Sequence, residues 1–269
     1  MRAGERSGLG RYGSVAIVAG AAEGLGAAFS RELARAGLDL VLVDVREDLL
    51  GALARELEAA FAVRVRAVVV DLAAPDAGER IERAAADWPI GLVVFNAAAA
   101  PIGPFERLAF ADAARVVDVN NRAALDLLSR FVPAMVARGR GALVLVGSNA
   151  GLLGHPLTAV YGASKAFLVR LGEALHVELA PRGIDVLVPC PGAIATPNLA
   201  RSGARLSRFL TADPNEVARE ALAELGRGRA VVSLGAANRL TMTVLSALPR
   251  QIATRLLGRV MRATYPRAQ

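Results

Sequence analysis

The sequence predicts an α/β protein with a doubly wound, seven-stranded parallel sheet, helices on both faces of that sheet, and a helical extension at the C-terminal end. Two observations favour this class. Short β-branched runs alternate with longer alanine- and leucine-rich amphipathic stretches, which is the pattern of repeated βαβ units. The short runs are also nearly all apolar, as strands covered on both faces are.

The apolar runs predict strands, in order, at Val15–Ala19, Leu40–Val43, Ala67–Val70, Leu92–Phe95, Ala142–Val146, Asp185–Val188 and Ala230–Val232. The amphipathic stretches between them predict helices near Leu25–Ala36, Glu47–Ala60, Ala77–Asp87, Ala113–Ala137, Tyr161–Ala180 and Asn215–Leu225. The last helix has a clear start, because Asp213 suits the N-cap and Pro214 the first helical position.

A chain of 269 residues with 54% hydrophobic content fits one large domain. We expect a flexible N-terminal arm at 1–13, the main α/β domain at 14–235, and an amphipathic extension at 236–269. The polar arm does not resemble a secretory signal, so we expect a cytoplasmic protein. With one cysteine, Cys190, and two histidines, His155 and His176, we expect neither a disulfide within the chain nor a metal site.

The net charge of +7 does not favour nucleic acid as a partner, because the arginines are scattered and only three tyrosines and one tryptophan are available for stacking. Lys165 is the single lysine among 32 basic residues, and it follows Tyr161 by four positions. The two side chains therefore share one face of a helix. Lysine differs from arginine in carrying a compact point charge, which indicates a functional ammonium. An exposed lysine in an arginine-rich chain is the alternative.

A glycine-rich turn follows the first strand and contains Gly20, Gly24 and Gly26. Glycine permits positive φ and close approach, and the amides that open the next helix attract anions, so this GxxxGxG turn suits a pyrophosphate. Asp44 ends the second strand, where its carboxylate could bind the ribose hydroxyls of an adenosine. Glu23 adds negative charge that Arg46 only partly offsets, which favours NAD over NADP. A turn without a ligand, with Asp44 as a turn residue, is the alternative.

Five motifs occur in an order that resembles one family. They are GAAEGLG at 20–26, Asp71 after the third strand, NAAA at 96–99, Asn120 in VNNRA, and Ser148, Tyr161 and Lys165 followed by PGAIAT at 191–196. Across about residues 14–197 the chain is similar to the short-chain dehydrogenases/reductases. The resemblance implies a Rossmann-type fold and an oxidoreductase that transfers a hydride between NAD(H) and a secondary alcohol or ketone.

The resemblance also implies roles for individual residues. Tyr161 would be the general acid or base, and Ser148 would orient the substrate oxygen. Lys165 would hold the nicotinamide ribose, and Asn120 would complete a proton relay. Cofactor contacts would fall on Gly20, Glu23, Gly24, Leu25, Gly26, Asp44, Val45, Asp71, Leu72, Asn96, Ala97, Ala98, Tyr161, Lys165, Pro191, Gly192, Ile194 and Thr196. The chain departs from the family at Ala19, where threonine is usual, and at 95–98, where two asparagines and a glycine are usual.

Electrostatics supports the role of the tyrosine. A phenol titrates near 10, but a positive charge about 4 Å away at an effective dielectric near 20 is worth roughly 4 kcal/mol, or about three pK units. We therefore predict that Lys165 lowers the pKa of Tyr161 to about 7, near the pH at which an acid/base catalyst works best.

The remaining expectations concern the substrate and partners. Residues 197–212 would form a substrate lid, and with Leu152, Leu153 and His155 they suggest a mainly apolar alcohol or ketone. The family favours a homodimer or homotetramer through helices 113–137 and 161–180. In the extension, apolar residues from Leu240 to Val260 recur at helical spacing among arginines. Packing over the substrate cleft or on a second subunit is favoured over a membrane-surface contact. A catalytically silent, cofactor-binding scaffold is the alternative function.

Overall fold

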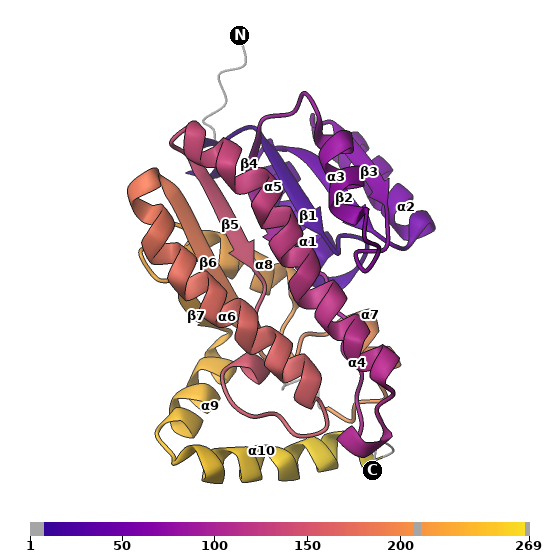
Figure 1. The fold of residues 1–269 in the computed structure, drawn as a ribbon, viewed down its shortest axis with the longest axis vertical. Coiled ribbons are helices and arrows are strands. Elements are labelled where there is room, and N and C mark those ends of the chain that lie inside the picture. The colour runs from indigo at the N-terminus through magenta and orange to yellow at the C-terminus, as the bar shows by residue number, and fades with distance from the viewer. Residues whose placement is uncertain (1–7, 207–210, 267–269) are drawn as a thin grey trace.

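The computed structural model describes residues 8–206 and 211–266, and its centre is a parallel seven-stranded sheet in the order β3-β2-β1-β4-β5-β6-β7 (Figure 1). The strands are β1 (Val15–Ala19), β2 (Asp39–Asp44), β3 (Val65–Val69), β4 (Ile90–Phe95), β5 (Gly141–Leu145), β6 (Ile184–Pro191) and β7 (Val231–Leu234). All seven predicted strands are present, and the predicted fold class is confirmed. The order reverses between β1 and β4, and ligands of such sheets bind at that point.

Helices cover both faces of the sheet, as predicted. One layer contains α1 (Gly24–Arg35), α2 (Glu47–Ala60) and α8 (Pro214–Glu224), and the other contains α3 (Ala77–Ala85), α5 (Ala123–Ala137) and α6 (Ala159–Leu179). Successive residues of β1 alternate between the two cores, with Ala16 and Val18 on the first and Ile17 on the second. The helix that starts at Pro214 is capped as predicted, because the Asp213 carboxylate accepts from the backbone N–H groups of Asn215 and Glu216.

The stretch predicted as one helix at 113–137 is interrupted. It forms α4 (Phe110–Val117), a π-helical turn at Asp118–Arg122, and α5. The π turn adds a residue to one turn of helix, and such turns are frequent at functional sites. Here it contains Asn120, one of the predicted catalytic residues.

Part of the predicted flexible arm is packed against the domain. Residues 1–7 lie outside the described residues, but Gly8–Arg11 forms a 3-10 turn and Tyr12 is only 4% exposed. The Tyr12 hydroxyl donates to Asp185 Oδ2 over 2.6 Å. The prediction of a loose arm is therefore wrong for residues 8–13, because a contact with β6 fixes them.

The predicted lid and the predicted C-terminal extension both contain helices. The predicted lid begins with α7 (Pro197–Arg201), capped by the Thr196 hydroxyl, while its residues 207–210 lie outside the described residues. The predicted extension forms α9 (Ala236–Ser246) and α10 (Arg250–Thr264), and α10 runs along the lower edge of the molecule in Figure 1. Among the described helices, none combines the length and the hydropathy that a bilayer span requires.

Candidate active site

The glycine turn after β1 is built so tightly that side chains cannot enter it. Gly20 and Gly24 have φ values of 78° and 58°. A Cβ on Gly20 would lie 2.6 Å from the Cα atom of Ala97, and one on Gly26 would lie 1.8 Å from the carbonyl oxygen of Gly20. These contacts explain the three glycines. The turn leads directly into the N-terminus of α1, which is a geometry suited to a phosphate group.

Two other predicted segments meet this turn. The Asn96 side chain, after β4, donates from Nδ2 to the Gly20 carbonyl over 2.8 Å. Thr196, after β6, lies so close that a Cβ on Gly24 would be 2.9 Å from its Cγ2 atom. The carboxyl ends of β1, β4 and β6 therefore bring these residues together, as expected for parallel strands around a switch point.

Asp44 at the end of β2 is joined to the glycine turn by hydrogen bonds. Its Oδ2 atom accepts from the backbone N–H of Ala22 over 2.9 Å, and its Oδ1 atom accepts from the Arg46 side chain over 3.1 Å. The Arg46 guanidinium also forms an ion pair with Glu23, at 2.7 Å. Arg201 of α7 forms a second ion pair with Glu23.

This charge cluster at the predicted ribose pocket thus holds two carboxylates and two guanidinium groups. Burial acts to raise the pKa of Glu23, but the hydrogen bonds from Arg201 and Arg46 outweigh it and lower that pKa. Glu23 therefore stays ionised and ties the lid helix α7 to the glycine turn.

The other predicted cofactor residues lie around this edge of the sheet. The Asp71 carboxylate pairs with Arg115 at 2.9 Å, and this pairing lowers the pKa of Asp71. Leu25 and Leu72 are buried, whereas Val45 is 55% exposed. Pro191 ends β6. Beyond it, Ile194 forms a bridge with Ala212 at the far end of the lid segment.

The predicted catalytic serine, tyrosine and lysine are close together. Ser148 follows β5, and its hydroxyl lies close enough to the phenol of Tyr161, in the first turns of α6, to act on the pKa of that phenol. A Cβ on Gly151 would lie 2.7 Å from the carbonyl carbon of Lys165. The turn after Ser148 therefore packs closely against the backbone of α6. Lys165 is 2% exposed, and its Nζ atom donates to the Val146 carbonyl oxygen over 2.7 Å.

The predicted pKa of Tyr161 is wrong in direction. Burial raises the pKa of the Tyr161 phenol, and the hydrogen bond with Ser148 opposes this only in part. The Lys165 Nζ atom lies 5.8 Å from the centroid of the Tyr161 ring. The prediction placed a charge beside the phenol and neglected the loss of hydration that burial brings. The same burial lowers the pKa of Lys165 to about 8.

Asn120 connects the loop after β4 with α6. Its Oδ1 atom accepts from the backbone N–H of Ala99 over 2.7 Å, and its Nδ2 atom donates to the Ser164 hydroxyl over 2.9 Å. Ser164 in turn donates to the backbone carbonyl of Tyr161 over 2.7 Å. Asn120 is fully buried, so the structure assigns its side chain to fixing the helix that holds Tyr161 and Lys165.

Sequence analysis missed two of these supporting residues. Ser164 lies between Tyr161 and Lys165, and its position inside that motif was the available signal. Asn238 of α9 had no such signal. Its side chain forms an amide pair with Asn149 and donates to the Cys190 carbonyl over 3.2 Å. The extension is therefore anchored to the residue that follows Ser148.

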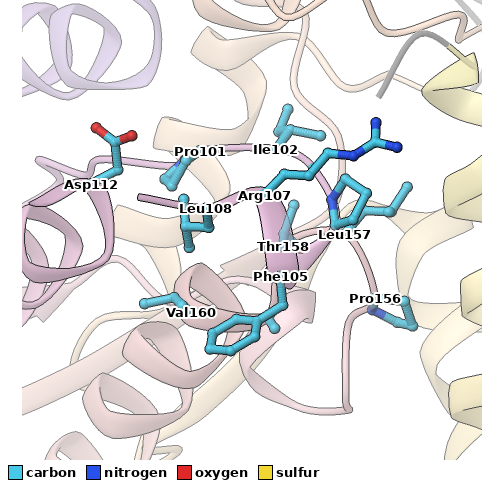
Figure 2. A pocket seen from close by; sticks show the side chains of 13 residues that line it. Pro101, Ile102, Phe105, Arg107, Leu108, Asp112, Pro156, Leu157, Thr158 and Val160 are labelled. Carbon is cyan, nitrogen blue, oxygen red and sulfur yellow. The ribbon is translucent and has the colours of Figure 1, made fainter. Parts of the chain in front are cut away.

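A cavity of about 520 Å³ opens between residues 101–112 and 156–160 (Figure 2). Most of the side chains around it are apolar, among them Ile102, Leu108 and Val160, and Arg107 and Asp112 add charge. The second lining segment ends one residue before Tyr161. Tyr161 and Ser148 are not among the lining residues, but the wall of the cavity suits an apolar group.

The residues predicted to contact the substrate from the loop after Ser148 are placed differently. Leu153 is 9% exposed and packs with Met242 and Ala253 beneath the extension. The Nδ1 atom of His155 lies 2.9 Å from the Thr158 hydroxyl, and burial lowers the pKa of His155. These side chains stabilise the loop around the cavity.

Comparisons with known proteins agree with this geometry. Residues 14–206 match the family described as short chain dehydrogenase. The chain is 29% identical to a 7beta-hydroxysteroid dehydrogenase of Clostridium sardiniense, over 93% of this chain and 96% of that protein. It is 30% identical to the human very-long-chain 3-oxoacyl-CoA reductase, over 72% of this chain and 62% of that enzyme.

Solved structures give the same result. One from a study of 7beta-hydroxysteroid dehydrogenase stereoselectivity superposes with a TM-score of 0.87 at 27% identity, covering 92% of this chain and 98% of the other. A short-chain dehydrogenase from Sphingobium yanoikuyae in complex with NADPH gives 0.77 at 31% identity, covering 87% and 93%. The protein is therefore an oxidoreductase that belongs to the short-chain dehydrogenase/reductase family.

Proposed function

We propose that this protein transfers a hydride between NAD(H) and a bulky, mainly apolar secondary alcohol or ketone, with Tyr161 exchanging the proton. The observation that carries the proposal is the grouping of Ser148 beside the Tyr161 phenol, with the buried ammonium of Lys165 one helical turn further along α6 and bonded to the Val146 carbonyl. A polar trio at the carboxyl end of a parallel sheet is difficult to explain by packing alone.

The residues present fit a dinucleotide. The glycine turn would take the pyrophosphate, because a side chain on Gly20 or Gly26 would collide with backbone, whereas a phosphate can lie against the amides at the start of α1. The ammonium of Lys165 has three donors and Val146 uses one, so two remain for the hydroxyls of the nicotinamide ribose.

Asp44 supports NAD as the preferred dinucleotide. Its carboxylate faces the glycine turn through Ala22 and would accept hydrogen bonds from ribose hydroxyls, and both it and Glu23 oppose a 2′-phosphate. Arg46 offsets part of this charge. A solved relative binds NADPH, so the preference depends on the individual carboxylates of this chain and not on the family.

In the proposed reaction, a nicotinamide held by these residues would supply or accept the hydride. Tyr161 is held in its protonated form by burial, which is the form that donates a proton to a ketone oxygen. Ser148 can donate to the same oxygen as negative charge develops on it. Lys165 lies close enough to favour the phenolate that remains, and Asn120 holds α6 in register through Ser164.

The cavity supports a bulky apolar substrate. Its volume of about 520 Å³ is within the range of small-molecule sites, and apolar side chains dominate its wall. The names of two relatives point to substrates of similar character, a hydroxysteroid and a very-long-chain 3-oxoacyl-CoA. We infer a substrate of this size class, held between residues 101–112 and 156–160.

The assembly and location are part of the same proposal. Exposed apolar residues on α4, α5 and α6, namely Val117 at 51%, Leu125 at 44% and Val177 at 72%, support a homodimer or homotetramer through these helices. A single buried cysteine, Cys190, suits a reducing compartment, so we place the reaction in the cytoplasm.

Replacement of Tyr161 by phenylalanine tests the function. Turnover of NADH with a panel of bulky apolar ketones should fall by roughly 10²- to 10⁴-fold, because the proton donor is removed. NADH binding, followed by fluorescence, should stay near that of the wild type. The matched Tyr12→Phe variant removes a hydroxyl at the opposite end of the sheet and should retain turnover.

Full activity in Tyr161→Phe would refute the assigned role. A wild-type protein that binds NADH but turns over no ketone or alcohol in the panel would instead favour the scaffold alternative.

A further inference from the structure

The C-terminal extension differs from the rest of the chain in its charge. Residues 236–269 contain six arginines and no acidic residue. Arg239 pairs with Glu220 of α8. By contrast, Arg250, Arg255 and Arg259 of α10 are exposed, and no ion pair joins them to a carboxylate in the described part of the chain. These three arginines therefore give α10 positive charge that no carboxylate in residues 8–206 and 211–266 neutralises through an ion pair.

The helix α10 has two distinct faces. Its inner face contains Ala253 and Met261, which are buried, and Gly258, which would touch Pro156 if it carried a Cβ. Its outer face carries Ile252, Leu256 and Val260, which are 45%, 37% and 57% exposed. These three residues follow the i, i+4, i+8 spacing and therefore form one stripe along the helix.

The helix α9 continues this pattern. Met242 is buried with Leu153 and Ala253, while Leu240 and Val244 are 68% and 56% exposed. Five large apolar side chains are thus exposed on two consecutive helices, beside Arg250, Arg255 and Arg259. Isolated exposed apolar residues are common, but a repeated stripe with cations beside it is typical of helices that lie in a membrane interface.

We propose that the outer face of α9 and α10 docks on an anionic membrane surface. Lipid phosphates would neutralise Arg250, Arg255 and Arg259, while the apolar stripe enters the boundary between headgroups and acyl chains. A second copy is a poorer occupant, because a two-fold contact would set each cationic face against its own image, and no acidic residue of the extension offsets that repulsion.

Docking would bring the substrate side of the protein to the bilayer. The inner face of α10 covers the loop between Ser148 and Tyr161, and its last residue, Thr264, accepts a hydrogen bond from the backbone N–H of Arg205 in the lid segment over 2.9 Å. With the proposed apolar substrate, this arrangement lets the substrate enter from lipid. The docking itself does not depend on the proposed reaction, and Tyr161→Phe should bind membranes as the wild type does.

Sedimentation of the full-length protein with vesicles tests the proposal. Wild-type protein should sediment with vesicles of equal parts phosphatidylglycerol and phosphatidylcholine, and not with phosphatidylcholine alone. Each arginine near an anionic surface changes the partition coefficient about fivefold, so Arg250→Gln/Arg255→Gln/Arg259→Gln should lower it roughly 100-fold. Ile252→Ser/Leu256→Ser/Val260→Ser should also weaken binding, because it removes the inserted groups.

The matched control is Arg55→Gln/Arg140→Gln/Arg182→Gln, which removes the same charge from exposed positions outside the extension. It should retain most of the binding. Absence of vesicle binding by the wild type, equal losses in the control and the α10 variant, or equal binding to phosphatidylcholine alone would each overturn the proposal. If instead the α10 variant converts an oligomer to a smaller species in ultracentrifugation without vesicles, the face belongs to a second copy.

Discussion

Lys165 gives a prediction whose size can be worked from the structure. The side chain is 2% exposed, and burial lowers its pKa from the ordinary value of 10.5 to about 8. Unfolding returns the ammonium to water and restores its ordinary pKa. Between these two values the unfolded state therefore binds more protons than the folded state, so the free energy of unfolding rises with pH. Replacement of Lys165 by methionine removes this contribution.

The magnitude follows from the two pKa values. Each pK unit corresponds to 1.36 kcal/mol, so a difference of about 2.5 units is worth roughly 3 kcal/mol. Below about pH 8 both states of the wild type keep the proton, and the difference between wild type and variant is constant. From about pH 7 to about pH 10 the wild type should gain roughly 2 to 3 kcal/mol relative to Lys165→Met.

Urea unfolding of the wild type and of Lys165→Met at pH 7 and pH 10 measures this difference in free energy. All other titratable groups are present in both proteins and contribute equally to the two free energies. Tyr161→Phe keeps the ammonium and is the matched control, so its free energy of unfolding should also rise with pH over this range. A difference between wild type and Lys165→Met that does not change with pH would refute the buried ammonium, and a decrease with pH would reverse the sign of the reasoning. Turnover should be lost in Lys165→Met at every pH.

Two further predictions concern the cofactor and the assembly. Asp44→Ala should raise the ratio of NADPH to NADH use, measured as kcat/KM, because it removes one of the two carboxylates that oppose a 2′-phosphate and hold Arg46. An unaltered ratio would argue against the ribose contact. The variant Val117→Asp/Leu125→Asp should have a smaller sedimentation coefficient than the wild-type oligomer, because the substitutions would bury charge in the proposed interface. A wild type that is already monomeric would contradict the proposed assembly.

The strands were predictable because a parallel sheet buried on both faces requires continuous apolar runs, and few other structures do. Helix α2 was predicted with its observed ends, Glu47–Ala60, because the amphipathic pattern begins at Glu47 and ends at Ala60. The π turn at Asp118–Arg122 was not predictable, because one extra residue in a turn hardly disturbs the spacing of apolar residues. The contact of Tyr12 with Asp185 joins residues 173 positions apart, and no local pattern indicates it.

The candidate site shows the same division between what spacing determines and what packing determines. Spacing places Tyr161 and Lys165 on one face of α6, and the carboxyl ends of the strands gather the glycine turn, Asp44 and Thr196. Spacing does not determine that the Lys165 ammonium donates to the Val146 carbonyl, nor that burial removes the Tyr161 phenol from water. Burial disfavours the charged forms of both residues, so it raises the pKa of Tyr161 and lowers the pKa of Lys165. In the function that we propose, Tyr161 therefore acts as the proton donor, which is the form that burial favours.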